Sequence, residues 1–389
     1  MRSKEVSSTV PTPETTQPST PTESNSPLRR KASRRSFLRS GMVAGAATMS
    51  VGMLARSAAF GQETSSSLTA GDIALLNFAL AAEQIESDLW QQYAELGGLT
   101  PGQLPVETAP FTPMNTYQAA FMNLDSDGPQ YITSNFNDEV SHEDFLTAYL
   151  ISKGAEPTDL TAFATLPSSQ VAQQIGRLTN IMDLTVDTSW FVRYRSTKNP
   201  DLGANFPQAL KLARVPAIPR NESDFGPQAH VQAIANTAAF HFGMIEQTGT
   251  SLYPALAQKA SSGEVLKILL SIGGDETLHF LEWVDFSGNA VQPTVAPLTD
   301  PTNGLTFPNF DETVNPLLQT NLIFGVSTEF ISPDLPRCSI IRPTNPQGFC
   351  MGVVKALTNS GHFIGQKNPD FLTTLKKIAA AADAVPVRS

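Results

Sequence analysis

The chain has 389 residues, of which 41% are hydrophobic and 16% charged, so it is long enough for one or two domains with a sizeable core. The net charge of −10 argues against nucleic acid as the main partner, because neutralising phosphates requires a basic surface. No apolar run reaches the roughly 18–20 residues of a membrane-spanning helix. Two cysteines cannot form a four-cysteine zinc site or a dense disulfide scaffold.

Residues 1–61 have the layout of an export signal. Residues 1–28 are rich in Ser, Thr and Pro and are predicted to be disordered. Arg34 and Arg35 precede Phe-Leu, and a short apolar run at 41–55 and small residues follow. The adjacent arginines are typical of a twin-arginine signal, so we expect export to the periplasm or the extracellular space, with no stable membrane span after cleavage. The alternatives are an N-terminal membrane anchor and a basic tail.

Without this segment the protein is more acidic. Residues 62–389 contain 17 basic against 33 acidic side chains, a net charge of −16. An oxidising compartment would also allow a disulfide between Cys338 and Cys350. The alternative is two unpaired buried thiols.

Helical periodicity recurs along residues 68–290, which predicts one all-α domain. Thr69 is expected to cap its first helix, which Gly97 and Gly98 would end. Prolines mark an irregular insertion at about 165–228. The expected helices cover about 68–97, 112–124, 134–153, 168–195, 227–260 and 264–286.

Residues 291–389 differ in composition from the helical domain, because prolines are frequent up to Pro346. Short helices are expected at about 348–358 and 369–383. This Pro-rich C-terminal extension is predicted to wrap around the helical domain rather than to fold alone.

Two predicted helices carry the same motif, Asp-Glu-x-x-His. It begins at Asp138 in one helix and at Asp275 in the other. Glu and His three residues apart lie on one face of a helix within one turn, so both side chains can reach one metal ion. The helices before these motifs carry Glu83 and Glu246, each with an aromatic residue seven positions later. The chain therefore contains a twofold repeat of paired helices.

This repeat is the ligand pattern of a carboxylate-bridged two-metal site in a four-helix bundle. Four carboxylates would neutralise two divalent cations, and two imidazoles would leave positions open for water, dioxygen or peroxide. Carboxylate-rich ligation suits iron or manganese better than copper. Solvated helix faces, or a bundle that keeps the residues without metal, are the alternatives. The predicted ligands are Glu83, Glu139, His142, Glu246, Glu276 and His279.

These motifs resemble the ferritin-like superfamily, and the segments 76–83 and 138–146 are most similar to its desiccation- and stress-related branch. The resemblance covers about 70–160 and 230–285. It implies a four-helix bundle with a di-iron or di-manganese centre, but no defined catalytic activity. In bacterioferritin-like relatives the aspartate before each motif orients the histidine of the opposite helix. Here this implies Asp138 beside His279 and Asp275 beside His142, and ordinary helix polarity is the alternative for the aspartates.

Some neighbouring residues have other interpretations. Glu86 and Glu143 are candidate substitutes for the ligands on their own helices. Trp90, Tyr93 and Tyr253 are better explained by core packing than by electron transfer. The remaining histidines are expected outside the site, on the surface or in packing positions; they are His230, His241 and His362.

Two functions compete at this point. A redox protein would oxidise ferrous ions or consume peroxide and so protect the cell envelope against oxidative or drying stress. A non-enzymatic stress or structural protein would keep the bundle without turnover. A storage cage is less favoured because of the insertion and the long extension, and the sequence leaves homo-oligomerisation open.

Overall fold

The computed structural model describes residues 67–100, 112–193, 207–311, 331–338 and 345–388. Residues 65–389 form one compact unit. The predicted export signal lies outside the described residues. Within the described part, no helix is both long and apolar enough to cross a membrane.

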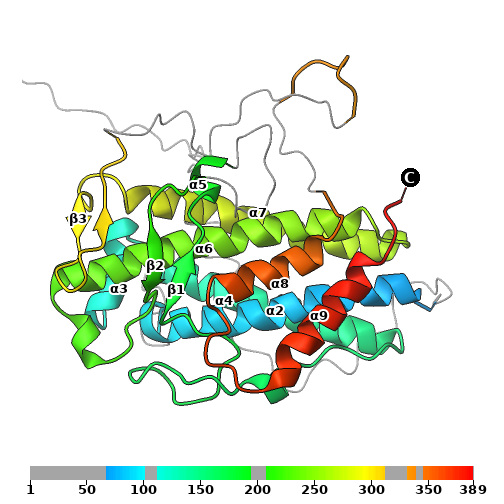
Figure 1. Ribbon diagram of the computed structural model, residues 1–389, viewed down its shortest axis with the longest axis horizontal. Coiled ribbons are helices and arrows are strands. Elements are labelled where there is room, and N and C mark those ends of the chain that lie inside the picture. Colours follow the sequence, from blue (N-terminus) through cyan, green and yellow to red (C-terminus); the bar gives the residue numbers. More distant parts are fainter. Residues whose placement is uncertain (1–66, 101–111, 194–206, 312–330, 339–344, 389) are drawn as a thin grey trace, which may run out of the picture. The chain divides into compact units, whose positions relative to one another are not determined.

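Four long helices build the core, which confirms the predicted all-α class. They are α2 (Ala70–Gly97), α4 (Gly128–Ser152), α6 (Gln228–Ala257) and α7 (Gly263–Asn289). Helix α2 packs closely on α4 and α6 packs closely on α7, and the two pairs lie together in the bundle of Figure 1. A short helix, α3 (Thr116–Leu124), packs mainly on α6.

The helix ends follow from local sequence. The Thr69 hydroxyl accepts a hydrogen bond from the Asp72 N–H at 3.1 Å, so it caps α2 as expected. Ser262 caps α7 in the same way through the Val265 N–H. Helix α4 begins six residues earlier than predicted, at Gly128, because Pro129 suits the first turn of a helix.

The predicted helix at 168–195 is wrong. Its described part, residues 168–193, is mostly irregular. It contains β1 (Leu184–Val186), which pairs antiparallel with β2 (Leu212–Val215), and the short helix α5 (Trp190–Arg193). Individual side chains of this segment make separate contacts with the bundle. Buried Arg177 donates to Glu95 of α2 at 2.6 Å, and the Trp190 indole N–H donates to the Phe240 carbonyl at 3.2 Å. These tertiary contacts override the helical spacing.

The rest of the insertion contains a 3₁₀ turn, η3 (Glu222–Phe225), and another, η2 (Thr161–Phe163), precedes it. After the bundle come a small hairpin, β3 (Leu298–Thr299) and β4 (Thr306–Phe307), and two helices, α8 (Phe349–Asn359) and α9 (Pro369–Asp383). Both helices lie where the sequence predicts them.

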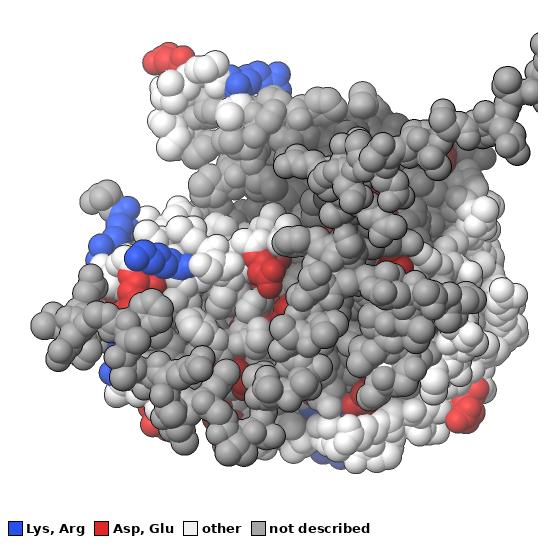
Figure 2. Space-filling model, turned by 180° about the vertical axis from the view of Figure 1, so that it is seen from behind, with Lys and Arg blue, Asp and Glu red and all other residues white. Residues whose placement is uncertain are grey.

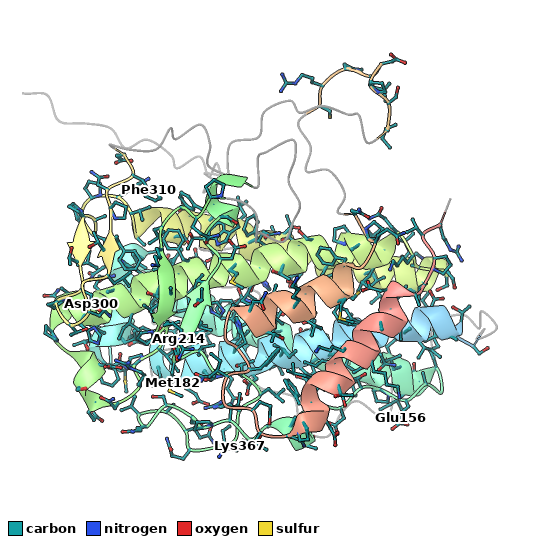
Figure 3. The ribbon with its side chains drawn as sticks, viewed as in Figure 1. Glu156, Met182, Arg214, Asp300, Phe310 and Lys367 are labelled. Carbon is teal, nitrogen blue, oxygen red and sulfur yellow. The ribbon has the colours of Figure 1, made fainter. Side chains whose placement is uncertain are left out.

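The C-terminal helices pack on the bundle. Helix α9 contacts α2 and α8, and α8 contacts α6, on the side facing the viewer in Figure 1. The Lys259 ammonium donates to the carbonyls of Ala382 and Asp383 at the end of α9. At the hairpin, Asp300, which Figure 3 labels, contacts His230 of α6 through a 2.8 Å hydrogen bond.

The expected disulfide is not formed. Cys338 is exposed, whereas Cys350 is buried at the start of α8, and both thiols are free. The Cys350 backbone N–H donates to Asp383 of α9, so this cysteine is held in the contact between the two C-terminal helices. The packing of α8 and α9, rather than a covalent bond, fixes this part of the extension.

Charge is unevenly arranged on the surface seen in Figure 2. The coloured acidic side chains are spread over that face, while most coloured lysines and arginines lie toward one side. Among the residues coloured there, no broad basic patch faces the viewer.

The contact between Trp190 and α6 gives a test of how the insertion is anchored. A Cβ atom on Gly243 would lie 2.3 Å from the Trp190 ring, so Gly243→Ala forces the insertion away from the bundle. We expect a loss of about 1–3 kcal/mol, measured by urea unfolding. Gly274→Ala is the matched control, because no atom lies within 4 Å of a Cβ there, and it should stabilise by about 0.5–1 kcal/mol. Equal stability of the two variants would contradict this packing.

Candidate metal centre

Each long helix places one glutamate in the middle of the bundle. These residues are Glu83 of α2, Glu139 of α4, Glu246 of α6 and Glu276 of α7, and all four are fully buried. Four carboxylates in an apolar interior are expensive unless positive charge accompanies them. Their convergence is therefore the first sign of a functional site.

Two histidines lie on either side of Glu139. The Nδ1 atom of His142 is 3.2 Å from Glu139 Oε2 and 3.4 Å from Glu83 Oε2. The Nδ1 atom of His279 is 3.2 Å from Glu139 Oε1 and 3.4 Å from Glu246 Oε2. Both rings thus direct Nδ1 toward the carboxylates.

The four glutamates and two histidines form two overlapping groups, each of which could hold a metal ion. Within each group, one ligand atom per residue lies within 4.8 Å of the others. Glu139 and Glu276 belong to both groups, so the two share a pair of carboxylates. One group is Glu83, Glu139, His142 and Glu276, and the other is Glu139, Glu246, Glu276 and His279.

Several carboxylate oxygens of this cluster have no hydrogen bond. They are Oε2 of Glu83, Oε2 of Glu246 and both oxygens of Glu276. A buried acceptor without a donor costs about 1–3 kcal/mol, and more when it is charged. Metal cations would satisfy these atoms, so the residues present fit a pair of divalent ions.

Burial also disturbs the protonation of the cluster. Burial, followed by the nearby carboxylates, raises the pKa of Glu276 well above its usual value. Burial raises the pKa of Glu139 to about 7, although hydrogen bonds with His142 and His279 oppose the shift. Burial lowers the pKa of His142, but hydrogen bonds, first with Asp275, outweigh it and raise the pKa to about 12. The cluster holds protons that bound cations would displace.

The far sides of the imidazoles contact aspartates. His142 Nε2 lies 3.3 Å from Asp275 Oδ2, and His279 Nε2 lies 3.4 Å from Asp138 Oδ2. Each contact crosses between α4 and α7. Such carboxylates fix the orientation and tautomer of a ligand histidine and increase its basicity. All six predicted ligands and both aspartates therefore lie in one cluster.

Asn135 is not among the predicted site residues, yet its side chain contacts the cluster. Its Nδ2 donates to Glu139 Oε1 at 2.7 Å and to Glu246 Oε1 at 3.1 Å, and its Oδ1 accepts from the Trp283 indole at 2.7 Å. Asn135 stands one helical turn before Glu139, and this spacing could have identified it.

Tyr253 also contacts the cluster, because its hydroxyl donates to Glu83 Oε1. Core packing is the favoured interpretation of Tyr253 from the sequence, with electron transfer as the alternative, and this polar contact was not predicted. Glu86 is buried nearby but belongs to neither ligand group, and Glu143 is half-buried outside both.

The other three histidines lie outside the ligand groups. All of them are buried, so none is a surface residue. They are His230, His241 and His362.

A route from solvent ends beside His142. An open depression of about 640 Å³ lies between α4 and α7, with Asp275 also in its wall. Its other lining residues include Phe145, Ile272 and Leu278. The depression therefore reaches the cluster at the His142 ring, and none of the four buried glutamates lines it.

A comparison with protein families supports the assignment of this architecture. The ferritin-like domain family matches residues 71–285, which is more than half of the chain and spans α2 to α7. Comparisons with curated proteins and with solved structures find no match. With its paired long helices and the buried Glu and His side chains that they bring together, the chain belongs to the ferritin-like domain family.

Proposed function

We propose that this protein binds two iron or manganese ions between its four long helices. Glu139 and Glu276, which belong to both ligand groups, would be shared by the two ions. Glu83 and His142 complete the first position, and Glu246 and His279 complete the second. The observation that carries the proposal is the sharing of two carboxylates by two ligand groups, because a single-ion site would not need it.

Two such ions, when bound, supply one-electron redox chemistry toward dioxygen or peroxide. The chain contributes the environment for this chemistry. The bundle keeps water away from the carboxylates, Asp138 and Asp275 orient the imidazoles, and the depression beside His142 admits small oxidants. We further propose export through the twin-arginine pathway, supported by Arg34 and Arg35, and a role in protection against oxidative or drying stress.

Elemental analysis of protein purified from its own host tests the metal sites. We expect two metal ions per chain and a clear loss in Glu139→Gln, which removes a charge shared by both positions. His142→Ala and Glu246→Ala should each lower the metal content as well. Glu143→Gln is the control on the same helix and should bind like the wild type. Equal metal content in Glu139→Gln and Glu143→Gln would count against the assignment.

Turnover separates the proposed role from a non-enzymatic one. The metal-loaded protein is mixed with ferrous ions or with peroxide, and their consumption is followed. Consumption that is lost in Glu139→Gln supports redox protection. Full metal content without consumption supports a structural or stress protein instead.

Helix α6 approaches the Glu276 carboxylate closely at Gly249. A Cβ on Gly249 would lie 1.9 Å from Glu276 Oε2, the mobile end of that side chain. In Gly249→Ala the carboxylate must rotate away while the helices stay in place. We expect a wild-type circular dichroism spectrum with metal binding weakened about tenfold or more, measured by titration with Mn²⁺. Unchanged affinity would show that Glu276 is not a ligand.

The metal-free protein should lose stability as pH rises. The pKa values of Glu139, Glu276 and His142 are raised in the folded state, so it holds protons that the unfolded chain releases. The contribution of these three groups to stability therefore falls above about pH 4.5, where unfolded glutamate ionises, and it outnumbers the opposing contribution of His241 and His362, whose pKa values burial lowers. We expect the unfolding temperature to drop by several degrees between about pH 5 and pH 8. Stabilisation by Mn²⁺ should grow over this interval because the ions replace protons, and calorimetry at both pH values checks this.

A further inference from the structure

A buried chain of hydrogen bonds lies outside the proposed metal centre. The Tyr93 hydroxyl of α2 is 2.6 Å from His241 Nδ1 of α6, and His241 Nε2 is 2.7 Å from His362 Nε2. His362 Nδ1 is in turn 2.8 Å from the Ser360 hydroxyl. Tyr93 and both histidines are fully buried. Ser360 lines a cavity of about 490 Å³ between the paired strands β1 and β2, α6 and α8.

The protons along this chain of hydrogen bonds have one favourable arrangement. Burial lowers the pKa of His241 and lowers that of His362 to about 4, so both rings are neutral and each carries one N–H. Tyr93 donates to His241 Nδ1, His241 donates to His362, and His362 donates to Ser360. Ser360 then donates to the Ala356 carbonyl at 2.8 Å. The opposite direction would give the buried Tyr93 proton no acceptor among the hydrogen bonds that the structure describes.

An aromatic row connects Tyr93 with the proposed centre. The Tyr93 and Trp90 rings are 5.7 Å apart, and Trp90 stacks on Trp283 with a centroid distance of 5.3 Å. The Trp283 indole donates to Asn135, which donates to Glu139. One side of Tyr93 thus faces a path for an electron, and its hydroxyl faces a base for the proton.

We propose that Tyr93 is a redox-active site that gives up one electron through Trp90 and Trp283 and its phenolic proton to the His241–His362 pair. The proposal rests on the proposed metal centre for its oxidant, an iron or manganese ion that dioxygen or peroxide has oxidised. That ion gains the electron and its oxidation state falls by one.

The proton balance is complete within the chain. The Tyr93 O–H bond breaks and the proton binds His241 Nδ1, while the His241 Nε2 proton moves to His362 Nε2. His362 becomes the cation, His241 stays neutral and Tyr93 becomes a neutral phenoxyl radical. Reduction by one electron reverses both transfers. Without an adjacent base, oxidation would leave the proton on the oxidised phenol, which is a far stronger acid than an imidazolium ion, so transfer of the proton to the histidine pair lowers the cost of removing the electron.

Tyr117 provides an internal comparison. It is equally buried, but its hydroxyl donates to the backbone carbonyl of Ala217, which cannot accept a proton as a base. His362 also lies beyond residues 71–285, so the proton acceptor depends on the C-terminal extension.

The first experiment uses metal-free full-length protein oxidised by photogenerated ruthenium(III) tris-bipyridine, with radicals detected by electron paramagnetic resonance. We expect a tyrosyl signal with hyperfine coupling to one proton that exchanges in D₂O. This proton is the one that His241 Nδ1 donates to the phenoxyl oxygen after the transfer. The signal should fall at least tenfold in Tyr93→Phe and persist in Tyr117→Phe. A signal that survives in Tyr93→Phe, or that lacks the exchangeable coupling in the wild type, overturns the proposal. The coupling is read in the wild type, so this result does not depend on the folding of any variant.

The second experiment repeats the measurement on iron-loaded protein treated with peroxide, with metal content measured for every sample. The radical should form in the wild type and fall at least tenfold in Trp90→Phe, which retains its iron. A radical yield unaffected by Trp90→Phe refutes the aromatic path. Absence of bound iron in the wild type refutes the metal centre alone, because the ruthenium experiment tests Tyr93 without metal.

Discussion

Four carboxylates buried at the centre of a helix bundle are the constraint on which the rest of the structure depends. The helices cannot bury Glu83, Glu139, Glu246 and Glu276 at low free energy without positive charge between them. The imidazoles, Asn135 and Tyr253 supply some compensation, yet several oxygens have no hydrogen-bond donor. The interior is therefore compatible with bound cations, and without them it does not give the chain its greatest stability.

The arrangement has an approximate twofold character. Helices α2 and α4 supply Glu83, Glu139 and His142, and α6 and α7 supply the corresponding Glu246, Glu276 and His279. The contacts from His142 to Asp275 and from His279 to Asp138 cross between the two halves. The halves are thus joined by polar contacts at the cluster itself, in addition to the apolar packing around it.

Periodicity and spacing predicted most of this core from the sequence. Glu at one position and His three residues later need only a helix to share a face, so local geometry places Glu139 beside His142. Asn135 follows the same rule, but an asparagine carries no distinctive chemical signature. The helix predicted at 168–195 does not form, because Arg177 and Trp190 bind partners on α2 and α6. Such partners lie far away in the sequence, and a local pattern contains no information about them.

The contact of α9 with α2 has a consequence for biosynthesis. The last helix of the described unit covers part of the first, and the Arg388 N–H donates to the Gln258 carbonyl between α6 and α7. Nearly the whole polypeptide must therefore leave the ribosome before this surface closes. Until then the apolar side of α2 that faces α9 is exposed, and this exposure makes the nascent chain vulnerable to aggregation. A chaperone or transient collapse has to shield this surface.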